Sequence, residues 1–167
     1  RNTTDMTEKK KEITERLEGD LMYAQAYSSY IRINKALEGL GVNIHVCGLL
    51  FQPATEQVRC IDQFIFRFSK LQDSMGAKIF PIHIGISGED ITALPMRDIL
   101  NRLERYLIIP SADEWTYIRE LRNEISHDYP LFETDVAAIL NELFSKTNII
   151  FSIYSKLKSI FNNNRHA

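Results

Sequence analysis

The chain has 167 residues, of which 44% are hydrophobic and 25% charged, and this composition is ordinary for a soluble globular protein with a real core. We therefore expect one domain that covers residues 1–167. The formal net charge of −2 excludes proteins that grip long nucleic acid through a general basic excess, so any contact with RNA must be local.

The only cysteines, Cys47 and Cys60, are too few for a disulfide framework, and no Cys/His grouping has zinc-site spacing. These features favour a reducing cytoplasm and predict neither a metal site nor a cofactor. No apolar run approaches the roughly 20 residues that span a bilayer, and residues 1–20 are too polar for a signal peptide. We expect no membrane contact. Because the chain begins at Arg1 without an initiator methionine, we also expect that a native N-terminal segment is missing.

Residues 5–38 predict a long helix, because apolar residues recur there at three-to-four spacing and no proline interrupts them. Glycines and a proline break this pattern over 39–53, where the sequence is compatible with a short extended piece or with a packed loop. A second helix is predicted from about 54 to 78. Its apolar stripe is the widest in the chain, which makes it the best candidate for the core.

Pro81 and the glycines that follow it predict a loop after the second helix. Pro95 is suited to open a third helix, since a proline is well tolerated at the first helical position, and Pro110 is expected to end it. Ser111, followed three residues later by Glu114, matches a capping box. A fourth helix should therefore begin there.

The fourth helix is predicted to run toward Tyr129, where Pro130 opposes continuation. A last helix is predicted over roughly 134–161, with a continuous line of apolar residues. Five helices with almost no strand signal predict an all-α fold, an up-and-down helical bundle of four to five helices.

One charged side chain interrupts the apolar stripe of the fourth helix. Trp115, Ile118, Ile125 and Tyr129 follow a three-to-four spacing, and Arg122 lies among them. None of the positions that could neutralise Arg122 from within the helix holds a carboxylate. The partner of this guanidinium must therefore come from another part of the molecule or from a ligand.

Three polar residues form a second strip on the same helix, since Arg119, Asn123 and His127 are four residues apart. Arg119 is one turn from Arg122, and a bound phosphate would relieve the repulsion between the two guanidiniums. Five residues place Arg122 and His127 about 140° apart around a regular helix. They can converge on one substrate only if the helix end loosens or a second subunit completes the site.

The segment Arg122-Asn123, three residues, then His127-Asp128-Tyr129 resembles the Arg-x4-His-x-Tyr motif of HEPN domains, in particular of the HepT-like toxins. The asparagine directly after the arginine is also typical of that motif. A weaker likeness extends to Arg67–Asp73 and on to Lys78, to Ile109-Pro110-Ser111, and to the order of the helices. Roughly residues 12–162 are covered, but only the eight-residue motif is diagnostic.

This resemblance implies a metal-independent endoribonuclease toxin that works as a homodimer, with two motif helices facing across a cleft. It also implies an antitoxin partner, a minimal nucleotidyltransferase that adds AMP to Tyr129. RNA supplies its own nucleophile, the 2′-hydroxyl, so the enzyme needs mainly proton transfer and charge stabilisation. His127 would move the proton, Arg122 and Arg119 would bind phosphate oxygens, Asn123 would orient the imidazole or the phosphate, and Tyr129 would donate a hydrogen bond near the leaving group.

The predicted active helix is acidic, which opposes RNA binding, and cations elsewhere would have to compensate: Arg97, Arg102, Arg105, Lys146, Lys156, Lys158 and Arg165. A non-catalytic module that partners a nucleotidyltransferase is the alternative function. A third reading is a purely structural bundle in which Arg122 makes an interhelical salt bridge to Glu142 or Asp135, since a helical arginine is usually a solvated or salt-bridged group. His45 and His83 are assigned structural roles because neither has ligand-spaced partners.

Overall fold

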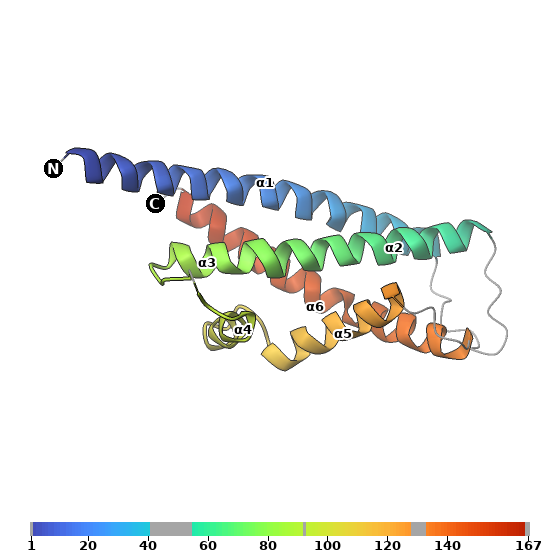
Figure 1. Cartoon of the computed structure of the whole chain (residues 1–167). Coiled ribbons are helices and arrows are strands. Elements are labelled where there is room, and N and C mark those ends of the chain that lie inside the picture. The colour runs from blue at the N-terminus through green and yellow to red at the C-terminus, as the bar shows by residue number, and fades with distance from the viewer. Residues whose placement is uncertain (1, 41–54, 92, 128–132, 166–167) are drawn as a thin grey trace.

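Helices build the molecule (Figure 1), and the computed structural model describes residues 2–40, 55–91, 93–127 and 133–165. The predicted connector over 39–53 lies almost wholly outside these ranges. No strand occurs in the described ranges, so the prediction of an all-α bundle is confirmed. The helices are α1 (Asn2–Leu40), α2 (Thr55–Ser74), the π-helix η2 (Met75–Ile79), α3 (Phe80–Ile86), α4 (Met96–Arg105), α5 (Ala112–His127) and α6 (Glu133–Arg165).

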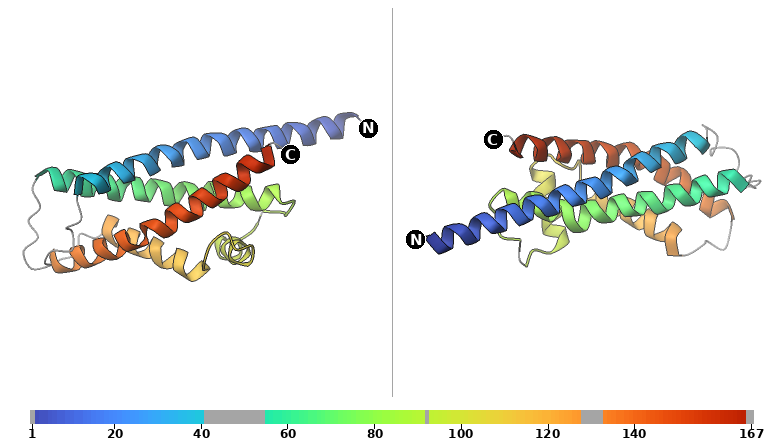
Figure 2. Two further views of the ribbon diagram at one scale, coloured as in Figure 1. Left: turned by 180° about the vertical axis from the view of Figure 1, so that it is seen from behind. Right: turned by 90° about the horizontal axis from the view of Figure 1, so that it is seen from above.

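The long helices run up and down. α1 and α2 lie side by side in opposite directions, and η2 and α3 continue the line of α2 (Figures 1 and 2). α5 packs against both α2 and α6, while the short α4 contacts α3 and α5. Phe64, Phe68 and Leu71 of α2 are fully buried, and each such side chain contributes roughly 1.5–3 kcal/mol on burial. The prediction that this helix provides the core is correct.

The second helix does not end at residue 78, because a π-turn carries it past Pro81. The Phe80 N–H donates to the Met75 carbonyl oxygen, and α3 begins there with the proline in its first turn. A proline normally clashes with the carbonyl four residues earlier, and the wider π-turn relieves this conflict. The chain leaves the helix only after Ile86, where Gly88 adopts a φ of 85°. The predicted loop at Pro81 was wrong, and the break at Gly88 was right.

The third helix starts as predicted, with Pro95 at its N-cap, but it ends earlier than Pro110. Leu107 has a φ of 56°, its N–H donates to the Glu104 carbonyl oxygen, and the Ile108 N–H donates to that of Leu103. These two bonds form a Schellman motif, in which a left-handed residue stops the helix. Glycine usually occupies that position, so the leucine at 107 gave no stop signal in the sequence.

α6 is a long and largely apolar helix. By length and composition the segment Val136–Asn164 would be able to cross a membrane. A core helix of a globular domain meets the same criterion. Here 33% of the apolar window of α6 is buried, and its buried residues include Leu140, Leu143, Ile150, Ile153 and Leu157. The expectation that the chain does not contact a membrane stays a prediction.

Candidate functional site

α5 carries four of the predicted site residues. It begins with the expected cap, since the Ser111 hydroxyl accepts hydrogen bonds from the backbone N–H groups of Asp113 (3.1 Å) and Glu114 (3.2 Å). Arg119 is exposed and Asn123 is half-buried. α5 remains α-helical through His127, whose side chain is not described, and Tyr129 lies outside the described residues.

Arg122 lies in the buried stripe of α5, as its spacing predicted. Ile118 and Ile125 on either side are buried, and the Arg122 side chain is only 12% exposed. Its Nη2 is 3.0 Å from Oδ1 of Asp73 on α2. A charge taken out of water needs a counter-charge, and another helix provides it, as the sequence required.

Asp73 was not among the carboxylates expected to pair with Arg122. The sequence suggested Glu142 or Asp135 instead. Glu142 lies 3.7 Å from Lys146 on its own helix, and the side chain of Asp135 is not described. A carboxylate thus occupies a place next to Arg122 where a phosphate was expected to relieve the repulsion from Arg119. The phosphate contact itself stays a prediction.

Two further polar side chains of α2 lie close in sequence to Asp73. The Ser69 hydroxyl and both polar atoms of the Gln72 amide are buried and have no hydrogen-bond partner among the residues that the structure describes. Gln72 is only 2% exposed. Leaving a buried polar group unsatisfied costs roughly 1–3 kcal/mol. Residues four apart lie on one face of a helix, which places Ser69 one turn from Asp73.

The segment Arg67–Asp73 had shown only a weak likeness to HEPN domains, and the roles of Ser69, Gln72 and Asp73 were missed. The available signal was a group of polar residues beside an apolar stripe that itself continues through Phe68, Leu71 and Met75. That signal gave no indication that α5 would pack against this point.

The acidity of α5 is compensated by two of the cations that the sequence had singled out. Arg97 of α4 is 2.7 Å from Asp113, and Lys146 of α6 is 2.8 Å from Glu114. The hydrogen bond to Glu114 raises the pKa of Lys146. Both cations neutralise the first turn of α5, so they are engaged within the molecule.

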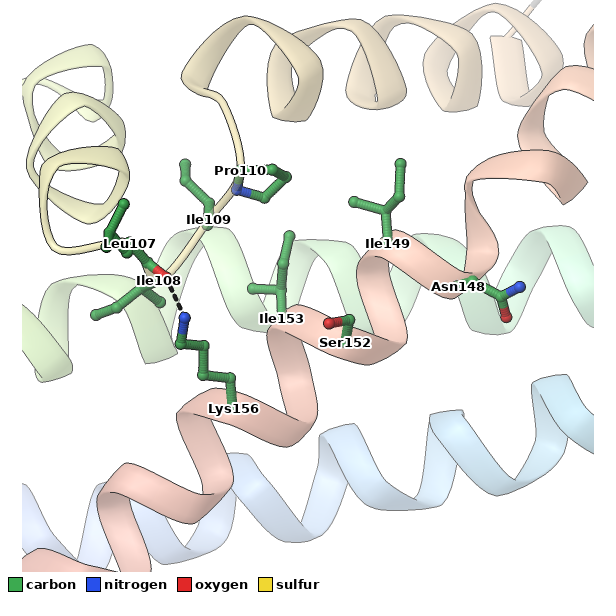
Figure 3. A pocket seen from close by; sticks show the side chains of 9 residues that line it. All are labelled: Leu107, Ile108, Ile109, Pro110, Asn148, Ile149, Ser152, Ile153 and Lys156. Carbon is green, nitrogen blue, oxygen red and sulfur yellow. Dashed lines mark hydrogen bonds between the residues drawn. The ribbon is translucent and has the colours of Figure 1, made fainter.

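The other candidate cations with described contacts are engaged elsewhere. Arg102 binds Glu89, and Lys158 lies 4.3 Å from the centre of the Tyr27 ring. Lys156 donates to the Leu107 carbonyl oxygen at the rim of a largely apolar hollow of about 490 Å³ between α6 and the loop that follows α4 (Figure 3). The predicted site residues of α5 do not line this hollow.

His83 has the structural place that the sequence assigned to it. It is 5% exposed, and a hydrogen bond of 2.5 Å joins its Nε2 to the Tyr23 hydroxyl. Burial lowers the pKa of His83 to about 4, and a hydrogen bond to the Leu157 backbone opposes this shift. Burial also raises the pKa of Tyr23, and that of Tyr154 to about 12. His45 lies outside the described residues.

No group of three or more His, Cys, Asp or Glu side chains within the described ranges is arranged to hold a metal ion. Comparisons of the chain with protein-family models, with curated proteins and with solved structures found no match.

Proposed function

We propose that this chain is a metal-independent endoribonuclease toxin, active as a homodimer and similar to HepT-like HEPN proteins. The observation that carries the proposal is the motif of Arg122, Asn123, His127 and Tyr129, which begins on the last turns of α5. The all-α bundle supports it, because the motif helix then packs between two long helices.

The chemistry needs few groups. RNA carries a 2′-hydroxyl next to the scissile phosphate, and His127 takes up or returns the proton when the hydroxyl attacks. Arg122 and Arg119 stabilise the charge on the non-bridging oxygens. The ion pair with Asp73 holds the Arg122 guanidinium in one orientation, and the buried polar groups of Ser69 and Gln72 are consistent with a site that binds a polar ligand.

The proposed site requires two copies of the chain. Arg122 and His127 are about 140° apart around a regular helix, and α5 stays regular through His127. Loosening of the helix before His127 is therefore not the way the two groups meet. The facing α5 of a second copy supplies the missing partner in the proposed cleft.

Regulation in this proposal comes from a minimal nucleotidyltransferase that adds AMP to Tyr129. The adduct places a bulky phosphate ester beside the site. Incubation with the transferase and ATP should increase the mass of the peptide that contains Tyr129 by AMP units, and Tyr129→Phe should prevent the increase. An unchanged mass would remove this branch of the proposal.

The central test is cleavage of RNA by the purified protein in the presence of EDTA. We expect cleavage by the natural chain and a loss of at least about 100-fold in rate for His127→Ala, the range for one general acid–base group. Fluorescence of the single, buried Trp115 checks that the variant is folded. Cleavage by the variant at the natural rate would remove His127 from the mechanism.

The second candidate is a non-catalytic module that binds a nucleotidyltransferase. The ion pair between Arg122 and Asp73 favours it, since a guanidinium committed to a carboxylate is less available to a phosphate. This candidate predicts tight binding to the transferase and no RNA cleavage under any condition. It also predicts that Arg122→Ala changes stability rather than a rate.

A further inference from the structure

The hollows that open between α1 and α2 form what we call the α1–α2 furrow. It contains two hollows, one of about 520 Å³ and one of about 530 Å³. The first is lined by Ala24, Gln25, Ser28, Ser29, Phe66, Arg67, Lys70 and Ser74. The second is lined by Ile31, Arg32, Lys35, Ala36, Arg59, Cys60 and Gln63.

The two hollows follow one another along the same side of the α1–α2 pair. Their lining residues on α1 recur at three-to-four spacing from Ala24 to Ala36, and those on α2 do so from Arg59 to Ser74, so each set lies on one face of its helix. The two helices lie side by side over this stretch (Figure 2). At a rise of about 1.5 Å per residue, the α1 wall is about 18 Å long.

The charge of the furrow is of one sign. Its cations are Arg32, Lys35, Arg59, Arg67 and Lys70, and none of the described residues that line the two hollows is a carboxylate. The whole chain has a net charge of −2, so this concentration of positive charge does not reflect its composition. A positively charged furrow raises the local concentration of polyanions.

The furrow also offers an aromatic surface. The Phe66 side chain is 52% exposed, with Arg67 at 5.1 Å and Lys70 at 5.5 Å from the ring centre. Exposed aromatic rings flanked by cations are how proteins bind single-stranded nucleic acid, because a base stacks on the ring while the cations bind phosphates. The Nε atom of Arg67 is buried and has no hydrogen-bond partner among the described residues.

The furrow adjoins the candidate site. Lys70 and Asp73 are three residues apart on α2, so they are neighbours on the helix surface, and Asp73 is the partner of Arg122. A chain that lies along the furrow can therefore continue across α2 toward α5.

We propose that the α1–α2 furrow binds the phosphate backbone of single-stranded RNA, with one base stacked on Phe66, and leads the strand toward Arg122. This inference rests on the proposed nuclease function, for which it supplies the region that holds the substrate. Duplex RNA fits less well, because its bases are already stacked and cannot reach the ring.

The test measures binding of a fluorescein-labelled single-stranded RNA in the His127→Ala background, so that cleavage does not interfere. We expect the double variant Lys35→Gln/Lys70→Gln to bind at least about tenfold more weakly. It should also reduce the salt slope of the logarithmic binding constant by about 1.4, which is about 0.7 for each lost phosphate contact on a single strand.

The matched control is Lys11→Gln/Lys78→Gln, which removes the same charge from exposed positions on α1 and η2 that line neither hollow. Phe66→Ala should weaken single-strand binding without changing the salt slope. Three outcomes would each overturn the proposed RNA-binding furrow. They are equal effects of the two double variants, no measurable RNA binding, and duplex RNA bound as tightly as the single strand.

The two proposals fail separately. If the natural chain binds RNA through the furrow but never cleaves it, the furrow stands and the nuclease assignment falls. If the natural chain cleaves RNA and Lys35→Gln/Lys70→Gln leaves KM and the salt slope unchanged, the nuclease assignment stands and the furrow falls.

Discussion

Arg122 combines a structural contact with a role in the proposed function. Its guanidinium lies in an apolar stripe, and Asp73 on a neighbouring helix provides the counter-charge. An ion pair of this kind is rarely a net source of stability, but removing one partner leaves a charge in a poorly solvated place. The exposure of the two partners differs, at 12% for Arg122 and 55% for Asp73, so water screens the pair in part.

Asp73→Asn should therefore destabilise the protein by about 1–2 kcal/mol, because the Arg122 guanidinium then has no counter-charge from Asp73 and is only partly exposed to water. Arg122→Met in the same background should recover part of that loss, because a flexible apolar chain fills the stripe. Urea unfolding followed by Trp115 fluorescence measures both effects. Asp62→Asn is the control, an exposed carboxylate on the same helix. Equal unfolding midpoints for Asp73→Asn and Asp62→Asn would contradict the proposed contribution of the ion pair to stability.

His83 makes the stability of the fold depend on pH. Its pKa in the folded protein is lowered to about 4, against an ordinary value near 6.5, so the unfolded chain binds the proton more readily. The stabilisation is complete above pH 6.5 and is lost as the pH falls toward 4, by up to about 3 kcal/mol in total.

We expect the free energy of unfolding to fall between pH 6.5 and 4 and the slope to be smaller in His83→Gln, which does not titrate. The difference between the two proteins isolates this residue from the carboxylates that also titrate near pH 4. The variant should be the less stable protein at pH 7, because it disturbs the contact with Tyr23. Identical slopes would show that His83 is not the group responsible.

At the scale of the elements, periodicity predicted the long helices well. The segments expected over 5–38 and 134–161 are α1 (Asn2–Leu40) and α6 (Glu133–Arg165), so each observed helix is slightly longer than expected. The errors came from prolines. Pro81 is accommodated by a π-turn that depends on how α2 packs, and the helix before Pro110 ends at a left-handed leucine. Neither feature has a local sequence signal.

Two buried helical glycines form a matched pair of tests. A Cβ atom on Gly76 would lie 3.6 Å from Trp115, an ordinary contact, whereas one on Gly19 would lie 2.9 Å from the Phe161 ring. That ring packs against Tyr23 at 4.8 Å between centres, so it has little room to move.

Gly76→Ala should raise the free energy of unfolding by up to about 1 kcal/mol, because alanine is the better helix former. Gly19→Ala gains the same helix preference but overpacks the core, which costs about 1–3 kcal/mol, so it should be neutral or destabilising. Thermal unfolding followed by circular dichroism ranks the variants. A Tm for Gly19→Ala above that of Gly76→Ala would contradict the packing described around Phe161.

Across the molecule, positive charge gathers at places that the sequence alone did not indicate. The start of α5 is neutralised by Arg97 and Lys146, while five cations from α1 and α2 line one furrow. The sequence identified Arg122 because its anomaly is local to one helix. It did not identify Asp73 or the furrow, because both depend on which helices become neighbours, and that is decided by the packing of the entire bundle.

The proposed homodimer leads to the last prediction. If one cleft takes groups from two facing α5 helices, two inactive variants should complement each other, since a mixed dimer of Arg122→Ala and His127→Ala keeps one guanidinium and one imidazole. Mixing the two proteins, with brief exposure to mild denaturant to exchange subunits, should restore RNA cleavage that neither shows alone. The control mixes each variant with the double variant Arg122→Ala/His127→Ala, in which one of the two groups is always missing. Analytical ultracentrifugation must show dimers in every mixture. Dimers that exchange subunits without recovering activity would mean that the two groups do not share a cleft, and the nuclease proposal would then lose the geometry on which it depends.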